Sequence, residues 1–245
     1  MSQRIVRKDH DGLCALTLNR PEKLNALDGA FFDELDEIAQ ALSQQTGDIG
    51  CVVVRASGRA FCAGADLAGV GVEQRDQRLN TKILERFSNL PQPIIAGVHG
   101  ICYTGGLELA LACDFIIAGS DSRFADTHGK WGFVSNWGMT QRLPRRIGEP
   151  AAKLLMMTGL PIDAGRALEI GLIDEVCQEG QLDRAVAGLA GSILENSWFT
   201  NASVKRLIRQ TRAMPLDQGL AHEAHNWPGS APDSRERVAK FTKRN

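Results

Sequence analysis

The chain has 245 residues, enough for one or two domains with a substantial buried core. Hydrophobic residues make up 43% and charged residues 23%, and the formal net charge of −1 argues against binding nucleic acid or an anionic membrane. The first residues are polar and predict no secretory signal. The most apolar stretch, 93–119, is interrupted by Glu108, Asp114 and several glycines, so no membrane span is predicted.

The six cysteines lie singly in apolar runs and form no CxxC pair: Cys14, Cys51, Cys62, Cys102, Cys113 and Cys177. This pattern is typical of reduced core thiols in a cytoplasmic protein. It predicts no metal site.

The first half of the chain alternates short apolar runs with segments of helical periodicity. Runs rich in apolar or β-branched residues predict strands at 4–7, 14–18, 51–56, 94–98 and 114–119. Helices are predicted at 28–44, 73–90 and 106–113, with a loop at 57–67 and a turn at 99–106. Because some strands follow one another directly, we expect an α/β layered fold of repeated ββα units rather than strict βαβ alternation.

The second half is predicted to be nearly all helix. The expected helices are 139–147, 150–158, 163–169, 182–194, 202–212, 216–226 and 232–240, with a short strand at 172–176. The last fifty or so residues are charged and amphipathic, which suits a packing or oligomerisation arm.

Two small-residue loops, "FCAGADL" (61–67) and "YTGGLEL" (103–109), each follow an apolar strand and open a helix. Small residues let a ligand approach the backbone, and the first amides of a helix lack partners within the helix. Two such N–H groups aimed at one point form an oxyanion hole, worth about 3–4 kcal/mol per donor in acyl-transfer enzymes. Either loop alone could be an ordinary tight turn, but together they favour a binding site.

Glu108 is the one ionisable residue of "GGLELALAC" (105–113). It could close a capping box, because with Gly105 as N-cap it falls at position N3. A buried carboxylate beside a glycine loop is also typical of a functional site, and we favour this second interpretation. Other catalytic patterns are missing: the sequence has no GxxxxGK[ST], no GxGxxG after a strand and no GxSxG elbow.

These segments resemble the crotonase (enoyl-CoA hydratase/isomerase) superfamily. The matching stretches are "LNRPEKLNAL" (18–27), "GRAFCAGADL" (58–67), "GGLELALACDFIIA" (105–118), "WGMTQRLPRRIG" (137–148) and "ALEIGLIDEV" (167–176), in the family's order. The resemblance implies a crotonase-like spiral of ββα units over 1–190 that holds a coenzyme A thioester. Residues 191–245 would form a C-terminal helical region for oligomerisation and for covering the pocket, in a homotrimer or dimer of trimers.

The resemblance also implies a role for individual residues. The backbone N–H groups of Ala65 and Gly105 would form the oxyanion hole, and Arg59 to Ala63 would lie along coenzyme A, with Ala63 near the adenine. Lys23 would contact a phosphate, although it could equally be a solvated loop lysine. The substrate set is completed by Gly64, Asp66, Gly106, Asn136 and Trp137. No cofactor is implied beyond the coenzyme A of the substrate.

The resemblance breaks down at the second catalytic position. Hydratases of the family use two glutamates, and Glu108 matches the first. Aligning Phe124 with the family's "F-G-x-P-E" segment puts Thr127 at the proline and His128 at the second glutamate. An imidazole can accept or donate a proton near pH 7, so His128 could serve as the second acid/base, or it could only line the pocket. A nearby "PG" of many hydratases reads Ser135-Asn136 here, followed by Trp137.

Three functions follow from these residues. The first is a hydratase that adds water across the α,β double bond of an acyl-CoA, with Glu108 as the principal acid/base. The second is another crotonase reaction: double-bond isomerisation, or hydrolysis or decarboxylation of a β-keto or malonyl thioester. The third is an acyl-CoA-binding protein without turnover, which the buried Glu108 argues against.

Overall fold

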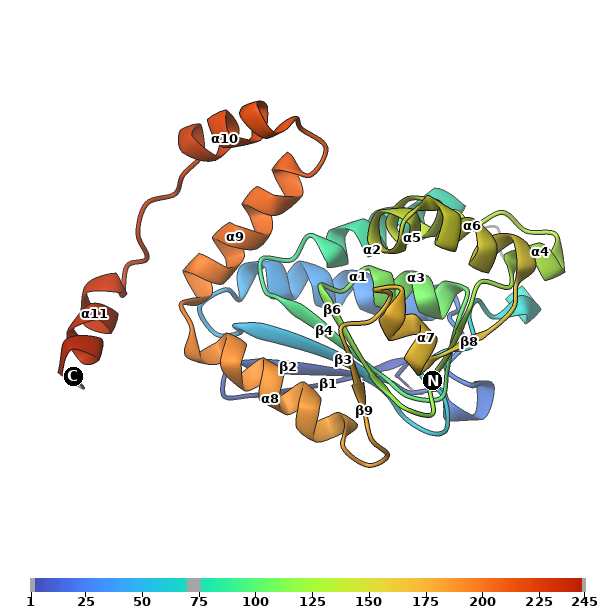
Figure 1. Cartoon of the computed structure of the whole chain (residues 1–245). Helices are drawn as coiled ribbons and strands as arrows, with labels where there is room; N and C mark the ends of the chain where they lie inside the picture. Colours follow the sequence, from blue (N-terminus) through green and yellow to red (C-terminus); the bar gives the residue numbers. More distant parts are fainter. Residues whose placement is uncertain (1–2, 70–75, 244–245) are drawn as a thin grey trace.

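The structure is a computed structural model that describes residues 3–69 and 76–243, and Figure 1 shows a layered body with a helical arm at its C-terminal end. The strands are β1 (Ile5–His10), β2 (Leu13–Leu18), β3 (Cys51–Ala56), β4 (Ile94–Val98), β5 (Ile101–Tyr103), β6 (Phe115–Gly119), β7 (Arg123–Ala125), β8 (Ile162–Asp163) and β9 (Glu175–Cys177). The helices of the body are α1 (Gly29–Gln44), α2 (Gln77–Ser88), α3 (Gly105–Leu111), α4 (His128–Trp131), α5 (Met139–Ile147), α6 (Glu149–Thr158), α7 (Ala164–Glu169) and α8 (Leu182–Glu195). The C-terminal helices are α9 (Trp198–Thr211), α10 (Leu216–His225) and α11 (Ser234–Thr242), and two 3₁₀ turns lie at Pro21–Lys23 and Leu67–Gly69.

The strands form two sheets. The larger has the order β1-β2-β3-β4-β6-β9, in which only the β1–β2 pair is antiparallel, and the smaller has the order β5-β7-β8. Strand β5 follows β4 directly and β7 follows β6, so each pair places one strand in each sheet before a helix begins. This arrangement confirms the predicted repeated ββα units.

The larger sheet is covered on both faces. Val52 and Val54 of β3 face the main core, which includes Phe32 of α1, whereas Val53 faces a second cluster that includes Val186 of α8. This alternation follows from the two-residue period of a strand. Figure 1 accordingly shows α1 and α3 on one side of the sheet and α8 on the other.

Local sequence explains where several helices begin. Asp28 accepts a hydrogen bond from the Phe31 N–H and so caps α1, which confirms the predicted helix at 28–44. Ser197 likewise caps α9 by accepting from the Thr200 N–H, so this helix begins four residues before the predicted position at 202.

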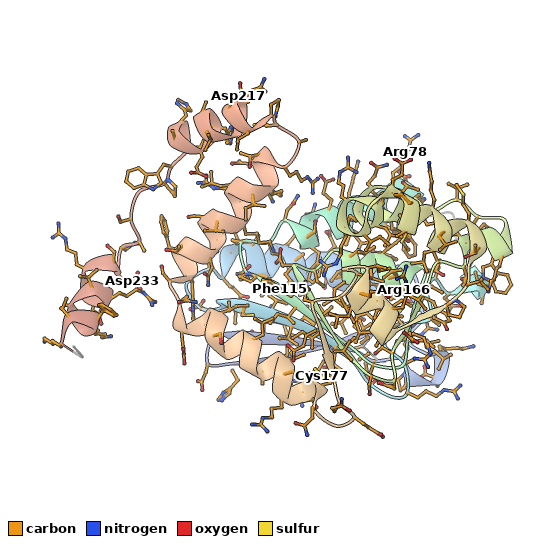
Figure 2. The ribbon with its side chains drawn as sticks, viewed as in Figure 1. Arg78, Phe115, Arg166, Cys177, Asp217 and Asp233 are labelled. Carbon is orange, nitrogen blue, oxygen red and sulfur yellow. The ribbon has the colours of Figure 1, made fainter. Side chains whose placement is uncertain are left out.

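The C-terminal arm is held to the body through α9. Lys205 on this helix donates to Asp114 at 2.6 Å and to the Gln92 carbonyl at 2.9 Å. Helices α10 and α11 contain no buried residue. Figure 2 shows Asp217 on α10 and Asp233 beside α11 well outside the layered body.

Some predicted elements are wrong or displaced. The predicted turn at 99–106 contains β5, and the predicted strand at 172–176 is displaced to β9. The predicted helix at 73–90 corresponds to α2, and its positions 73–75 lie outside the described residues. All six cysteines are buried and free, as predicted. In the described part of the chain, no helix combines the length and apolar character needed to cross a membrane.

Candidate active site

Glu108 lies in the first turn of α3, a helix in which every residue is buried. Its Oε1 accepts hydrogen bonds from the backbone N–H groups of Trp137 at 3.0 Å and Met139 at 3.1 Å. The capping-box interpretation is wrong, because Thr104 is the N-cap, Gly105 is already helical, and no side chain caps this end. The carboxylate instead bridges α3 to the segment that opens α5.

Burial raises the pKa of Glu108 to about 7, and the two amide donors and His128 only partly offset this. Its second oxygen, Oε2, is buried and has no hydrogen-bond partner among the residues that the structure describes. This oxygen lies 3.9 Å from Nε2 of His128. A carboxyl that is close to half ionised at neutral pH and keeps one unpaired oxygen is suited to exchanging protons.

His128 is the first residue of α4, one short turn after β7. Its Nδ1 lies 2.5 Å from Oδ1 of Asp126, a residue only 1% exposed. Burial lowers the pKa of His128, but the hydrogen bond and charge of Asp126, together with the charge of Glu108, outweigh this and raise the pKa above its usual value. The imidazole is therefore held between two carboxyl groups, with Nδ1 toward one and Nε2 toward the other.

The two small-residue loops meet beside Glu108. A methyl group on the Gly105 Cα would stand 3.3 Å from the Ala65 nitrogen and 2.6 Å from Cζ3 of Trp137, so only glycine fits there. Neither the Ala65 N–H nor the Gly105 N–H donates a hydrogen bond to another described residue. Two adjacent unpaired donors of this kind are what an oxyanion hole requires.

Backbone pairing holds the first loop in place. Leu27 N–H donates to the Gly64 carbonyl at 2.9 Å, and Asp66 N–H donates to the Leu27 carbonyl at 2.8 Å. Leu27 and Ala65 thus form a β-bridge through the Gly64 carbonyl and the Asp66 N–H. The N–H of Ala65 itself takes no part in this bridge. Gly106 lies behind this loop, where a methyl group would stand 2.6 Å from the Cys62 carbonyl oxygen.

Thr104 connects the start of α3 to the segment that carries His128. Its φ of 50° is in the left-handed region, which is unfavourable for a β-branched residue. Its N–H donates to the Ala125 carbonyl at 2.9 Å, and its hydroxyl lies 2.7 Å from the Thr127 hydroxyl. Gly105 directly follows Thr104, and His128 directly follows Thr127. These two hydrogen bonds therefore hold Gly105 and His128 in a fixed position relative to each other.

The residues predicted to hold coenzyme A lie in several environments. Lys23 and Arg59 are exposed, Ala63 is half-buried and Gly64 is buried. Asp66 is already engaged, because its carboxylate pairs with Arg20 at 2.9 Å.

Asn136 and Trp137, the two residues after α4 that were predicted to contact the substrate, differ in burial. Asn136 is exposed, and its carbonyl accepts from the Thr81 hydroxyl at 2.6 Å. Trp137 is buried and packs edge-on against Phe32, with ring centroids 4.7 Å apart. The Trp137 ring thus forms a wall beside Gly105, and its backbone N–H orients Glu108.

Sequence reasoning missed three contributors to the site: Asp126, Thr104 and Arg142. The Arg142 guanidinium donates to the Trp137 carbonyl at 2.8 Å, and burial lowers its pKa. Asp126 could have been found from its spacing, because a carboxylate two residues before a histidine can reach the histidine's backbone N–H and ring. No local signal marked Thr104 or Arg142, because their contacts join distant segments.

The geometry can be set beside known proteins. The profile of the enoyl-CoA hydratase/isomerase family matches residues 8–243. The chain belongs to this family. It is 32% identical to a protein of Arabidopsis thaliana named probable enoyl-CoA hydratase 1, peroxisomal, over 89% of this chain and 83% of that protein. It is 31% identical to the 1,2-epoxyphenylacetyl-CoA isomerase of Escherichia coli, over 98% of this chain and 96% of that protein.

The fold agrees with this family. The crystal structure of an enoyl-CoA hydratase from Bacillus anthracis superposes with a TM-score of 0.93 and 31% identity, covering 99% of this chain and 97% of the other. The crotonase-like fold predicted from the sequence is therefore confirmed. Across residues 3–69 and 76–243, no three His, Cys, Asp or Glu side chains gather as they would to hold a metal ion.

Proposed function

We propose that this protein is an enoyl-CoA hydratase that adds water across the α,β double bond of an acyl-CoA thioester. The observation that carries the proposal is the 3.9 Å approach of Glu108 Oε2 to His128 Nε2, next to the unused amides of Ala65 and Gly105. Two proton-transfer groups and two oxyanion donors at one point match the needs of hydration.

The two amides would hold the thioester carbonyl oxygen. When the water oxygen bonds to Cβ, the π electrons of the double bond move toward that carbonyl, and negative charge develops on its oxygen. Donors that are already in place stabilise this enolate more than the substrate, and so lower the barrier. Gly105 and Gly64 keep the approach to these amides free of side chains.

A single water molecule fits the separation of the two acid/base atoms. Hydrogen bonds of about 2.8 Å from one water to both Glu108 Oε2 and His128 Nε2 would meet at about 90°, near the angle that water prefers. The Glu108 carboxylate is the stronger candidate for activating this water, because Oε1 keeps its two amide donors while Oε2 is free to take the proton.

Double-bond isomerisation is the second candidate. The same pair of groups could remove a proton at one carbon of the acyl chain and return it at another, with the enolate held in the same way. The description of the family as enoyl-CoA hydratase/isomerase favours this alternative over hydrolysis or decarboxylation. A pure acyl-CoA-binding protein would gain nothing from a buried carboxylate with an unpaired oxygen.

A screen of thioesters tests the function directly. The purified protein is incubated with enoyl-, β-keto- and malonyl-CoA substrates, and the products are followed by mass spectrometry. Hydration gives a gain of one water on the enoyl-CoA, and isomerisation gives a new isomer of unchanged mass. Turnover of none of these, despite tight acyl-CoA binding, would contradict the proposal and favour the binding protein.

The contacts with coenzyme A are part of the proposal. Arg59 to Ala63 would line the coenzyme A channel together with Gly64 and Gly106, and Lys23 would approach a phosphate from an exposed position. For Asp66 we propose an indirect role, because its pairing with Arg20 fixes the loop that carries Ala65. Asn136 and Trp137 would border the acyl group.

We also propose that the chain assembles as a homotrimer or a dimer of trimers through 191–245. The C-terminal region, three helices and the segment between α10 and α11, carries large apolar side chains that are exposed in the single chain: Val204, Ile208, Leu216, Leu220, Trp227, Val238 and Phe241. An open hollow of about 390 Å³ also lies between Arg237 of α11 and Trp198 of α9. Light scattering coupled to size exclusion measures the assembly, and a stable monomer would contradict it.

A cytoplasmic location is a further part of the proposal, supported by six free cysteines. One relative is named as peroxisomal, so localisation of a tagged full-length protein is the measurement that decides.

A further inference from the structure

Asp126 is a buried carboxylate that the proposed hydration does not yet use. It lies between β7 and α4 and is 1% exposed. Both hydrogen bonds of its Oδ1 go to His128, at 2.5 Å to the ring Nδ1 and 3.2 Å to the backbone N–H. The carboxylate of Asp126 therefore interacts mainly with the imidazole of His128, and more weakly, through its charge, with the more distant Glu108.

A local structural role explains only part of this arrangement. Accepting the His128 N–H from two residues back is an ordinary turn contact that starts α4, and asparagine makes it equally well. It gives no reason for a charged side chain. A carboxylate buried this deeply is costly unless a cation faces it, and the imidazole ring is in contact with it.

We propose that Asp126 is a positioning residue that holds His128 as an imidazolium with Nε2–H directed at the reacting carbon, which makes His128 the acid and Glu108 the base. This inference rests on the proposed hydration. It assigns opposite tasks to Glu108, which the sequence marks as the principal acid/base, and to His128, which the sequence leaves as either a second acid/base or a pocket wall.

The proton transfers balance within one turnover. Glu108 Oε2 takes a proton from the water as the water oxygen bonds to Cβ, and the π electrons pass to the thioester oxygen. As the carbonyl re-forms, Cα takes the proton of His128 Nε2. Glu108 is then protonated and His128 neutral, and one proton transfer from Oε2 to Nε2, atoms 3.9 Å apart, restores the starting state.

The charged surroundings favour this direction. His128 faces Asp126 from the segment before α4 and Glu108 from α3, and Arg142 of α5 carries a positive charge near Glu108. On α4 itself, Lys130 is exposed. The two carboxyl groups raise the pKa of His128 despite its burial, so the imidazolium persists to higher pH than it would alone.

Asp126→Asn is the sharpest test, because asparagine keeps the turn contact and removes the charge. We expect kcat to fall about a hundredfold with KM little changed. The alkaline limb of the pH–rate profile should move about one pH unit lower, because the imidazolium loses its carboxylate. Asp163→Asn is the matched control: Asp163 caps α7 by accepting the Arg166 N–H, and its variant should keep wild-type turnover and pH profile.

A second readout does not depend on turnover. NMR of ¹⁵N-histidine-labelled protein, with the His128 signal assigned from His128→Gln, reports which ring nitrogen is protonated and at what pH. We expect Nδ1 to stay protonated in the wild type, and the His128 pKa to be lower in Asp126→Asn. Should that variant fail to fold, the wild-type spectrum alone decides, because a ring that is neutral at the pH of turnover, whether protonated at Nδ1 only or at Nε2 only, would overturn the inference.

The two proposals fail in different ways. An unchanged His128 titration together with an unchanged pH–rate profile in Asp126→Asn would overturn the role of Asp126, even if hydration is confirmed. A titration that depends on Asp126, in a protein that hydrates no enoyl-CoA, would support the positioning role and overturn the hydratase.

Discussion

The two sides of the candidate site are built in different ways. On the α3 side every residue is buried, and Glu108 is held by two backbone amides. Helix α4 itself contains no buried residue, Trp131 is 58% exposed, and the His128 ring hydrogen-bonds to one side chain, Asp126. Burial opposes the charge on Glu108, whereas a carboxylate favours the charge on His128. The comparison teaches that the pKa values of two neighbouring groups can both be raised by opposite means, by burial at Glu108 and by a facing carboxylate at His128.

Removing the proposed base, Glu108, from the buried side should have the largest effect. Glu108→Gln keeps an oxygen for the Trp137 and Met139 amides but cannot take a proton. We expect kcat to fall about a thousandfold or more, measured as loss of enoyl-thioester absorbance with crotonyl-CoA or the best substrate of the screen. Glu149→Gln, an exposed glutamate on α6, is the control and should keep its turnover. Wild-type turnover in Glu108→Gln would remove Glu108 from the mechanism.

Glu108→Gln should lower activity but raise the free energy of unfolding, relative to the wild type, as the pH increases. The pKa of Glu108 is about 7 in the folded protein against 4.5 ordinarily, so its contribution to folding is complete below pH 4.5 and is lost as the pH rises through 7. Above pH 7 the ionised wild type should be destabilised by about 3 kcal/mol relative to its protonated form. Glu108→Gln avoids this loss.

Urea unfolding at pH 5 and pH 8 measures this difference. The free energy of unfolding of the variant, minus that of the wild type, should be larger at pH 8 than at pH 5. An equal difference in unfolding free energy at both pH values would show that burial does not oppose the charge on Glu108.

On the more exposed side the loss should be smaller. We expect His128→Ala to reduce kcat about a hundredfold and to remove the alkaline limb of the pH–rate profile, because the acid is gone. His10→Ala, an exposed histidine at the end of β1, serves as the control. A loss of only a few-fold would show that His128 only lines the pocket. Glu108 would then be the only one of the two groups that transfers protons.

The smallest effect is expected where the two sides are joined. Thr127→Val removes the hydroxyl that lies 2.7 Å from that of Thr104 and conserves the shape of the side chain. Losing one hydrogen bond of about 1 kcal/mol should lower kcat about fivefold. Thr158→Val removes a similar hydroxyl on α6, away from the site, and should leave kcat unchanged. Equal rates for both variants would show that the two sides are positioned independently.

The sequence predicted the α3 side better than the α4 side for physical reasons. The glycine loops and the apolar run around Glu108 are local patterns, and they predicted α3, whereas the roles of the Ala65 and Gly105 amides were expected from the family resemblance. Strand β5 has only three residues and gains its identity by pairing with β7, which no local pattern reports. The partners of Glu108 come from Trp137 and Met139, 29 and 31 residues further along the chain.

The same distinction holds for the whole fold. Long periodic segments such as α1, with its cap at Asp28, were predicted within a residue or two. Short elements fixed by tertiary contacts, such as β8 and α4, were not. His128 was identified through resemblance, but its orientation depends on Asp126, whose burial only the folded chain shows.

The ion pair between Lys205 and Asp114 bears on where this chain could be shortened. Asp114 also accepts the Ile94 N–H at 2.8 Å, so it sits at the entry of β4 with the lysine as its counter-ion. A gene truncated at the predicted boundary of 190 would cut through α8 and remove the cation that pairs with Asp114 at the start of β4. A shortened version intended for crystallisation or engineering should therefore retain α9 and end beyond Thr211.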